Sequence, residues 1–142
     1  MNLDEAARHY GARTQILLRQ EAVDFSRPLG REKGRKFDRP GVYAICSRST
    51  GEPVYIGKAT NLRERFNQHR HGSMRSSAFR RSLSEKLGTR SELKLNDHIA
   101  RSYLSKSLPL KDPREMTRLE HFAIAVVNPP LNKPFDTDKP CP

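Results

Sequence analysis

Two short apolar runs, each with a tyrosine and a glycine, constrain the fold of this chain more than any other feature. The first run is GVY at residues 41–43, and the second is YIG at residues 55–57. A segment rich in turn-forming residues, 47–53, separates them. Apolar runs bounded by glycine, proline and serine are typical of β-strands. We therefore predict a hairpin with strands over 42–46 and 54–56, which holds two phenols side by side.

Helix signals flank this hairpin on both sides. Residues 5–23 carry apolar side chains at helical spacing, and Thr60 or Asn61 can cap a helix just after the second strand. Serines at the start of segment 76–88 and a glycine at its end predict another helix. The span 95–110 favours a helix followed by a third strand.

The last helix has clear boundaries and contains one residue that does not fit its inward face. Asp112 with the proline after it begins this helix, and Asn128 with two following prolines ends it. Glu120 falls on the same stripe as the apolar residues Met116, Leu119, Ala123, Val126 and Val127. Burying an unpaired carboxylate costs on the order of several kcal/mol, so Glu120 should reach a cleft and meet a cation or a metal. Alternatively, Glu120 lies at the boundary of the stripe and reaches water or an arginine.

The balance of charges indicates a partner rich in phosphate. The chain has 142 residues, with 27 Lys or Arg against 16 Asp or Glu, and its formal net charge is +11. A hydrophobic content of 35% suffices for one modest core, so we expect one small domain with appendages. The sequence has no long apolar run and no basic helix with a bulky aromatic face, so nucleic acid is a better candidate partner than a membrane.

The start of the chain and its cysteines favour a cytoplasmic location. Residues 1–5 lack the layout of a secretory signal. Cys46, in a predicted strand, and Cys141, near the end of the sequence, form neither a metal motif nor a convincing disulfide framework. The histidines also have no convincing zinc spacing. A reducing interior fits these observations.

The order of these features resembles a known enzyme family. The two triplets are followed by Arg65, ten residues after the second tyrosine, then by Glu120, and twelve residues later by Asn132. Either triplet alone is weak evidence, whereas the ordered set is specific. Residues 41–132 resemble the GIY-YIG nuclease superfamily, and 55–65 are similar to the core motif of the nuclease domain in UvrC-type repair proteins.

The resemblance implies a fold, a division of the chain and a reaction. The fold is α/β, more narrowly α+β: a small three-stranded antiparallel sheet flanked by helices, here with an N-terminal helical extension. An N-terminal helix and basic linker at 1–39 would precede a nuclease domain at 40–135 and a tail at 136–142. The linker is expected to lie against a polyanion or to form a solvated loop. The implied activity is that of an endonuclease that hydrolyses DNA phosphodiester bonds with Mg²⁺ or Mn²⁺.

The resemblance also implies which residues move protons. Tyr43 would act as the general base, assisted by Tyr55 or His69. A free phenol has a pKa near ~10, so Tyr43 can accept a proton efficiently only where a positive charge stabilises its phenolate. Lys58, which directly follows the YIG triplet, is a candidate to supply that charge.

A further group of residues would hold the phosphate and the metal ion. Glu120 matches the metal-binding glutamate of the family, and Arg65 matches the arginine that would clamp the phosphate. Asn132 would hold a loop or a water molecule by hydrogen bonding. The residues expected to contact the substrate are Lys58, Arg63, Arg65, Arg80, Arg81 and Asn132, with the Arg80-Arg81 pair facing outward.

Two other functions remain open at this point. A non-catalytic nucleic-acid-binding module on the same scaffold would keep the basic surface and lose a catalytic residue. A small basic structural protein of a ribonucleoprotein would leave the two triplets as accidents, with the tyrosines serving only for packing. If the protein is a nuclease that makes double-strand cuts, it would need a homodimer or two sequential encounters, because one active site cuts one strand per engagement.

Overall fold

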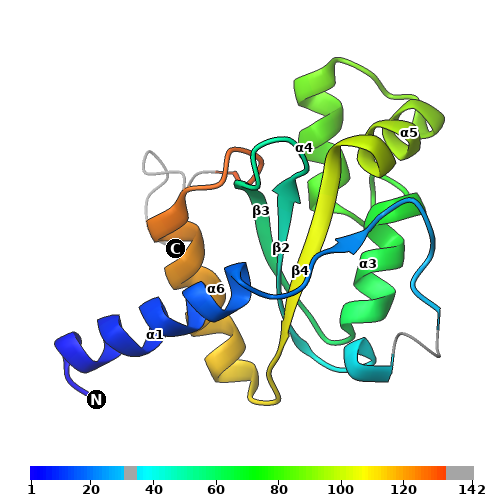
Figure 1. The fold of residues 1–142 in the computed structure, drawn as a ribbon. Helices are drawn as coiled ribbons and strands as arrows, with labels where there is room; N and C mark the ends of the chain where they lie inside the picture. Colours follow the sequence, from blue (N-terminus) through cyan, green and yellow to red (C-terminus); the bar gives the residue numbers. More distant parts are fainter. Residues whose placement is uncertain (31–34, 134–142) are drawn as a thin grey trace.

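The protein folds as a four-stranded antiparallel sheet with helices on both faces (Figure 1). The computed structural model describes residues 1–30 and 35–133. The strand order is β1-β4-β2-β3. No helix in these described ranges is long and apolar enough to cross a membrane. In chain order the elements are α1 (Leu3–Leu18), β1 (Val23–Asp24), η1 (Arg35–Phe37), β2 (Gly41–Ser47), β3 (Pro53–Ala59), α3 (Leu62–His71), α4 (Ala78–Leu87), α5 (Glu92–Ser102), β4 (Tyr103–Pro109) and α6 (Pro113–Val127).

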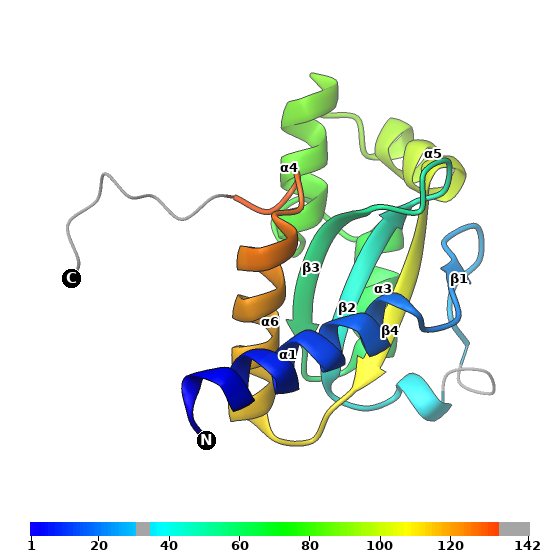
Figure 2. The same cartoon turned by 60° about the vertical axis from the view of Figure 1, so that its left-hand side comes forward.

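Strand β2 lies at the centre of the fold, and both of its faces are covered. Val42, Ala44 and Cys46 pack in a hydrophobic cluster with residues of α1 and α6. Tyr43 and Ile45 point the other way, into a second cluster with residues of α3, α4 and α5. Figures 1 and 2 show these two helical layers on opposite sides of the sheet. A continuous apolar run is what a strand buried on both faces requires.

The predicted hairpin is present, and its register puts both phenols on one face of the sheet. Tyr43 pairs with Gly57, and Ile45 pairs with Tyr55. Because side chains alternate along a strand, the two tyrosines are diagonal neighbours on the same face. Strand β3 is longer than predicted because the ladder continues through Lys58, which is therefore a strand residue.

The helix boundaries follow the capping signals in the sequence. The side chains of Asn61, Ser77 and Asp112 accept backbone N–H groups in the first turns of α3, α4 and α6. Gly88 and Asn128 end α4 and α6 in the left-handed conformation. The predicted helix and following strand correspond to α5 and β4.

One expectation about the sheet is wrong. The sheet has four strands instead of three, because the two-residue strand β1 pairs with β4. At the start of the predicted linker, Phe25 is fully buried and stacks on Phe66 of α3 with ring centroids 4.4 Å apart. One aromatic side chain thus anchors this segment to the core. Residues 31–34 of the linker and the predicted tail at 136–142 lie outside the described residues.

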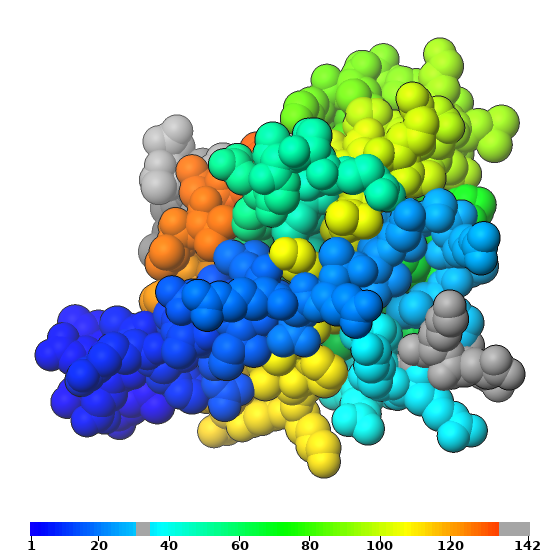
Figure 3. Space-filling model, in the orientation of Figure 1, coloured from blue at the N-terminus to red at the C-terminus, as the bar shows by residue number. Residues whose placement is uncertain are grey.

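The N-terminal helix packs against the helix that carries Glu120. Leu17 of α1 is fully buried, and the Tyr10 hydroxyl donates a hydrogen bond to Glu115 of α6 at 3.0 Å. The beginning of α1 extends past the rest of the surface seen in Figure 3, and Leu3 there is 85% exposed. The first turn of α1 therefore lies outside the core, to which the helix contributes from Ala6 onward.

The inward stripe of α6 is narrower than its sequence predicts. Met116, Leu119 and Ala123 are buried as expected. Val126 is 66% exposed, so its predicted inward position is wrong. On a helical wheel Val126 lies about 80° from Met116, at the edge of the stripe, where the sheet no longer covers it.

We predict that Leu119→Ala destabilises the protein by about 2–5 kcal/mol, because it leaves a cavity between α6 and the sheet. Val126→Ala on the same helix should change stability by no more than ~0.5 kcal/mol, because this side chain faces solvent. Urea unfolding followed by circular dichroism measures both free energies. Equal losses in the two variants would contradict this packing of α6.

Candidate active site

The two motif tyrosines meet a histidine of α3 in the interior of the protein. The ring centroids of Tyr43 and Tyr55 lie 6.3 Å apart. The Tyr43 hydroxyl lies 2.6 Å from Nε2 of His69. Tyr43 is 4% exposed and His69 only 1%. Tyr43, His69 and the partly buried Tyr55, three of the predicted site residues, therefore form one cluster.

Burial makes both phenols weaker acids than free tyrosine. It raises the pKa of Tyr43 well above its ordinary value; Tyr55 and Glu120 raise it further, while Arg65 lowers it. Burial and Glu120 likewise raise the pKa of Tyr55, and Arg65 again opposes them. The sequence suggested Lys58 as the cation that favours phenolate, but Arg65 has this effect on both phenols. The charge of Lys58 instead lowers the pKa of Glu120.

His69 is neutral at physiological pH. Burial lowers the pKa of its imidazole to about 3, with further lowering by the positive charges of Arg65 and Arg80. Its second ring nitrogen, Nδ1, lies 2.7 Å from Oγ of the fully buried Ser77. Ser77 was missed as a site residue, because a serine before a helix indicates a cap and gives no signal of a ring contact.

The glycine of the second triplet makes room for the Tyr43 hydroxyl. A Cβ atom at Gly57 would collide with Oη and Cζ of Tyr43. This follows from the register, since the two residues are direct partners across β2 and β3. The YIG triplet therefore contributes one phenol and the space for the other.

Two predicted cations border a pocket beside this cluster. Lys58 is exposed, and its Nζ donates to Oγ1 of Thr117 on α6 at 2.7 Å. Arg65 is half-buried, and its Nη1 donates to the carbonyl of Ser76 at 3.5 Å. The pocket has a volume of about 290 Å³, and its lining residues are Lys58, Ala59, Thr60, Arg65, Pro113, Met116 and Thr117. The ends of β3, α3 and α6 thus meet at the edge of the sheet formed by β3.

Glu120 lies on α6, one turn beyond this pocket. Its side chain is 16% exposed, and Oε1 lies 3.7 Å from Nε2 of His121. Burial raises the pKa of its carboxyl group, while the charges of Lys58 and His121 lower it. The described residues contain no cluster of three or more potential metal ligands. A lone carboxylate fits an ion of the Mg²⁺ type, which takes one or two carboxylates and fills its other positions with water and substrate phosphate.

Two predicted substrate contacts form hydrogen bonds with other parts of the protein. Asn132 accepts from the backbone N–H of Ile56 and donates to its carbonyl, both at 2.8 Å, so it fixes the segment after α6 to β3. This is the loop-holding role that the sequence suggested as one option. Arg63 pairs with Asp38 at 3.3 Å on another side of α3 from Arg65.

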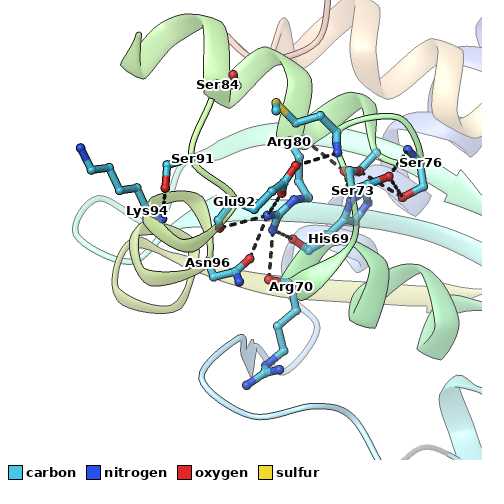
Figure 4. A network of polar contacts seen from close by, with 12 residues as sticks. His69, Arg70, Ser73, Ser76, Arg80, Ser84, Ser91, Glu92, Lys94 and Asn96 are labelled. Atoms are coloured by element: carbon cyan, nitrogen blue, oxygen red, sulfur yellow. Dashed lines mark hydrogen bonds and ion pairs between the residues drawn. The ribbon is translucent and has the colours of Figure 1, made fainter. Parts of the chain in front are cut away.

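The prediction that both arginines of the Arg80-Arg81 pair face outward is half wrong. Arg81 is exposed, although Nη1 donates to the backbone carbonyls of Met74 and Arg75. Arg80 is fully buried. Figure 4 shows its guanidinium group between α3 and α5, where it donates to the His69 and Arg70 carbonyls and to the side chains of Glu92 and Asn96. These acceptors compensate its charge, and its burial does not suit a substrate contact.

Comparisons with known proteins identify the family of this chain. The model of the GIY-YIG catalytic domain family matches residues 39–123. Solved structures of the GIY-YIG N-terminal endonuclease domain of UvrC from Thermotoga maritima are also similar. The magnesium-bound form is 25% identical with a TM-score of 0.43, and an asparagine-to-alanine mutant is 23% identical with a TM-score of 0.44. Each match covers 72% of this chain and 98% of the UvrC domain. A search of curated protein sequences finds no significant match.

The fold and the motif residues define a nuclease. The matched segment of 85 residues, from 39 to 123, is more than half of the 142-residue chain. The chain therefore belongs to the GIY-YIG family.

We predict that Gly57→Ala abolishes most of the nuclease activity while the protein remains folded. The added methyl group would displace the Tyr43 hydroxyl from His69, and a shift of ~1 Å in a catalytic group can cost roughly 10²-fold in rate. The nicking rate of plasmid DNA measures the loss. Gly11→Ala is the control: nothing lies within 4 Å of its added Cβ, so activity should be unchanged. An active Gly57→Ala enzyme would contradict a role for the position of Tyr43.

We predict that Glu120→Gln raises the melting temperature at high pH and that this gain disappears as the pH falls. Burial raises the pKa of Glu120, so the folded state holds this proton more tightly than the unfolded state. The carboxyl group therefore costs stability as the pH rises through its raised folded pKa, and this cost is absent below the unfolded pKa. Thermal unfolding without metal at pH values from about 4 to 8 tests the prediction. Glu85→Gln, on the exposed part of α4, should show no such trend.

Proposed function

We propose that this nuclease hydrolyses DNA phosphodiester bonds with a Mg²⁺ or Mn²⁺ ion held by Glu120. The observation that carries the proposal is the convergence of two phenols, two cations and a half-buried carboxylate from β2, β3, α3 and α6 at one edge of the sheet. Hydrolysis requires an activated water, relief of charge on the phosphoryl oxygens and a stabilised leaving oxygen. Packing alone would require none of these charged groups.

Tyr43 is the proposed general base. Its hydroxyl is held by His69, and Arg65 favours its deprotonated form. Burial opposes deprotonation in the free protein, so the phenol remains neutral until the substrate and the metal alter the local charge. Tyr55 supports Tyr43 as its neighbour in the same cluster.

Arg65 and Lys58 are the proposed phosphate contacts. Both border the pocket beside the tyrosines. Arg65 offers a planar fork that matches two phosphoryl oxygens, and Lys58 adds a mobile point charge. The exposed Arg81 would contact the substrate further from the reacting phosphate.

Glu120 is the proposed ligand of the divalent ion. A metal ion at this carboxylate would polarise a phosphate oxygen and offset charge that builds up on the leaving group. The partial burial that raises the pKa of Glu120 also restricts water around it, so a bound cation would meet a less screened charge than at the surface.

DNA is the proposed substrate because the chain is strongly basic. Its formal net charge of +11 favours association with a polyanion, and affinity should fall steeply with salt. A non-catalytic binding module would share this behaviour, so binding alone does not separate the two functions. Cleavage and its dependence on individual side chains do separate them.

We predict that Tyr43→Phe, Arg65→Ala and Glu120→Gln each reduce nicking of supercoiled plasmid in Mg²⁺ by roughly 10²–10⁴-fold, since each removes a group that acts on the transition state. EDTA should abolish wild-type cleavage. Arg101→Ala removes an exposed arginine of α5 that pairs with Asp97, and should retain full activity.

A binding measurement separates loss of the metal from loss of chemistry. Mg²⁺ should raise the melting temperature of the wild type and of Tyr43→Phe, but not that of Glu120→Gln.

Wild-type cleavage by all three variants would overturn the mechanism. If the wild type shifts DNA in a gel and never nicks it, the binding-module function is correct instead.

A further inference from the structure

We propose that Ser77 fixes the tautomer of His69, so that His69 donates its Nε2 proton to the phenolic oxygen of Tyr43 and acts as a hydrogen-bond donor instead of a second base. The inference rests on the proposed role of Tyr43 as the general base. It assigns a positioning role to Ser77, a residue outside the family motifs. It also defines the direction of the hydrogen bond between His69 and Tyr43.

The first step concerns the Ser77 hydroxyl group. Ser77 is fully buried, and its Oγ already accepts the backbone N–H of Arg80 at 3.1 Å. Its own O–H needs an acceptor, because a buried donor without a hydrogen-bond partner destabilises the folded state. Among the hydrogen bonds of the described residues, its only other polar neighbour is His69 Nδ1, at 2.7 Å. Ser77 therefore donates to Nδ1.

The second step concerns the imidazole proton. Burial and the charges of Arg65 and Arg80 keep the ring neutral, with a pKa of about 3. A neutral imidazole carries one proton, and a nitrogen that accepts a hydrogen bond does not carry it. Because Nδ1 accepts from Ser77, the proton lies on Nε2. That atom is 2.6 Å from the Tyr43 oxygen, so Nε2–H donates to Tyr43.

The third step concerns the direction of the chain of hydrogen bonds. It runs from Ser77 through His69 to Tyr43. The ring of Tyr55 lies beside that of Tyr43, with centroids 6.3 Å apart. When Tyr43 loses its proton, the Nε2–H group remains in place and stabilises the phenolate.

The start of α4 holds His69 at two points. Ser77 bonds the ring, and Nη1 of Arg80 donates to the His69 carbonyl at 3.0 Å (Figure 4). The Arg80 N–H to Ser77 Oγ bond joins these two contacts. This arrangement restrains both the position of the His69 backbone and the rotation of its imidazole. A histidine on the surface has no such restraints.

The titratable and charged groups around the hydrogen-bonded residues His69 and Tyr43 come from four elements. Tyr43 faces Tyr55 of β3, Arg65 of α3 and Glu120 of α6, besides His69. His69 faces Arg65 and, on α4, Arg80. Substitution of Ser77 leaves all these charges in place, so a change in the pH profile of a Ser77 variant reports on the hydrogen-bond direction.

The test compares Ser77→Ala with Ser77→Thr and with Ser91→Ala. Ser91 caps α5 as Ser77 caps α4, by accepting a backbone N–H at 3.3 Å, but it does not contact His69. Ser77→Ala should lower kcat at least tenfold with little change in KM, and should move the rising limb of the pH–kcat profile to higher pH. Ser77→Thr should restore both, and Ser91→Ala should change neither.

A second measurement reads the tautomer without activity. In ¹⁵N-labelled wild type, long-range ¹H–¹⁵N spectra should show His69 protonated at Nε2 only and unchanged from pH 5 to pH 8; His69→Gln identifies its signals. Protonation at Nδ1, or titration in that range, would overturn the inference even if Ser77→Ala fails to fold. The inference is also wrong if folded Ser77→Ala matches Ser91→Ala in kcat and pH profile. Full activity of Tyr43→Phe would instead overturn the proposed function. The spectra report only on the tautomer of His69, so the two failures can be told apart.

Discussion

The burial of β2 on both faces is the constraint on which the rest of the structure depends. Alternation along this strand sends Val42 and Ala44 toward α1 and α6, and Tyr43 toward α3. The two helical layers therefore touch opposite faces of the sheet, and the edge strand β3 is one place where their side chains can come together. Glu120 from one layer and Arg65 from the other both act on the pKa of the Tyr43 phenol. The candidate site therefore draws its residues from both layers.

A second consequence of burial is that the resting site holds little charge. Desolvation raises the pKa of Tyr43 and Glu120 and lowers that of His69, so each group is pushed toward its neutral form. The cations Arg65 and Lys58 stay at the pocket, where they attract an anion. A phosphate and a divalent ion would bring opposite charges to the site together, so the ionised forms of Tyr43 and Glu120 become favourable when the substrate is present. In the proposed mechanism, binding of the substrate and the metal would thus offset the cost of burying these groups.

Features set by a few neighbouring residues could be predicted from the sequence, and features set by tertiary contacts could not. The hairpin, the Asp112 cap and the stop at Asn128 depend on local turn and capping chemistry, and all three are correct. The pairing of Tyr43 with Tyr55 and His69 followed from strand alternation and from the resemblance. Strand β1 and the anchor at Phe25 were missed. A strand of two residues is too short to show a periodic pattern, and the sequence around a single aromatic residue does not indicate which residue it packs against. Arg80 was misplaced for the same reason, since Glu92 and Asn96 lie on the following helix and only the fold brings them to it.

Arg80 connects the stability of the fold with the chemistry of the site. A buried guanidinium carries a desolvation cost that only several good acceptors can offset. Here the acceptors include two carbonyls at the C-terminal end of α3, where an α-helix has unpaired carbonyls and the negative end of its dipole. Its positive charge adds to the effects of burial and Arg65, which lower the pKa of His69, and its backbone N–H donates to Ser77. A hydrophobic residue of similar volume could fill the space, yet it would leave the end of α3 unpaired and remove one of the charges that disfavour the imidazolium form. One buried residue thus both closes a helix and contributes to the neutral state of the imidazole beside the proposed base.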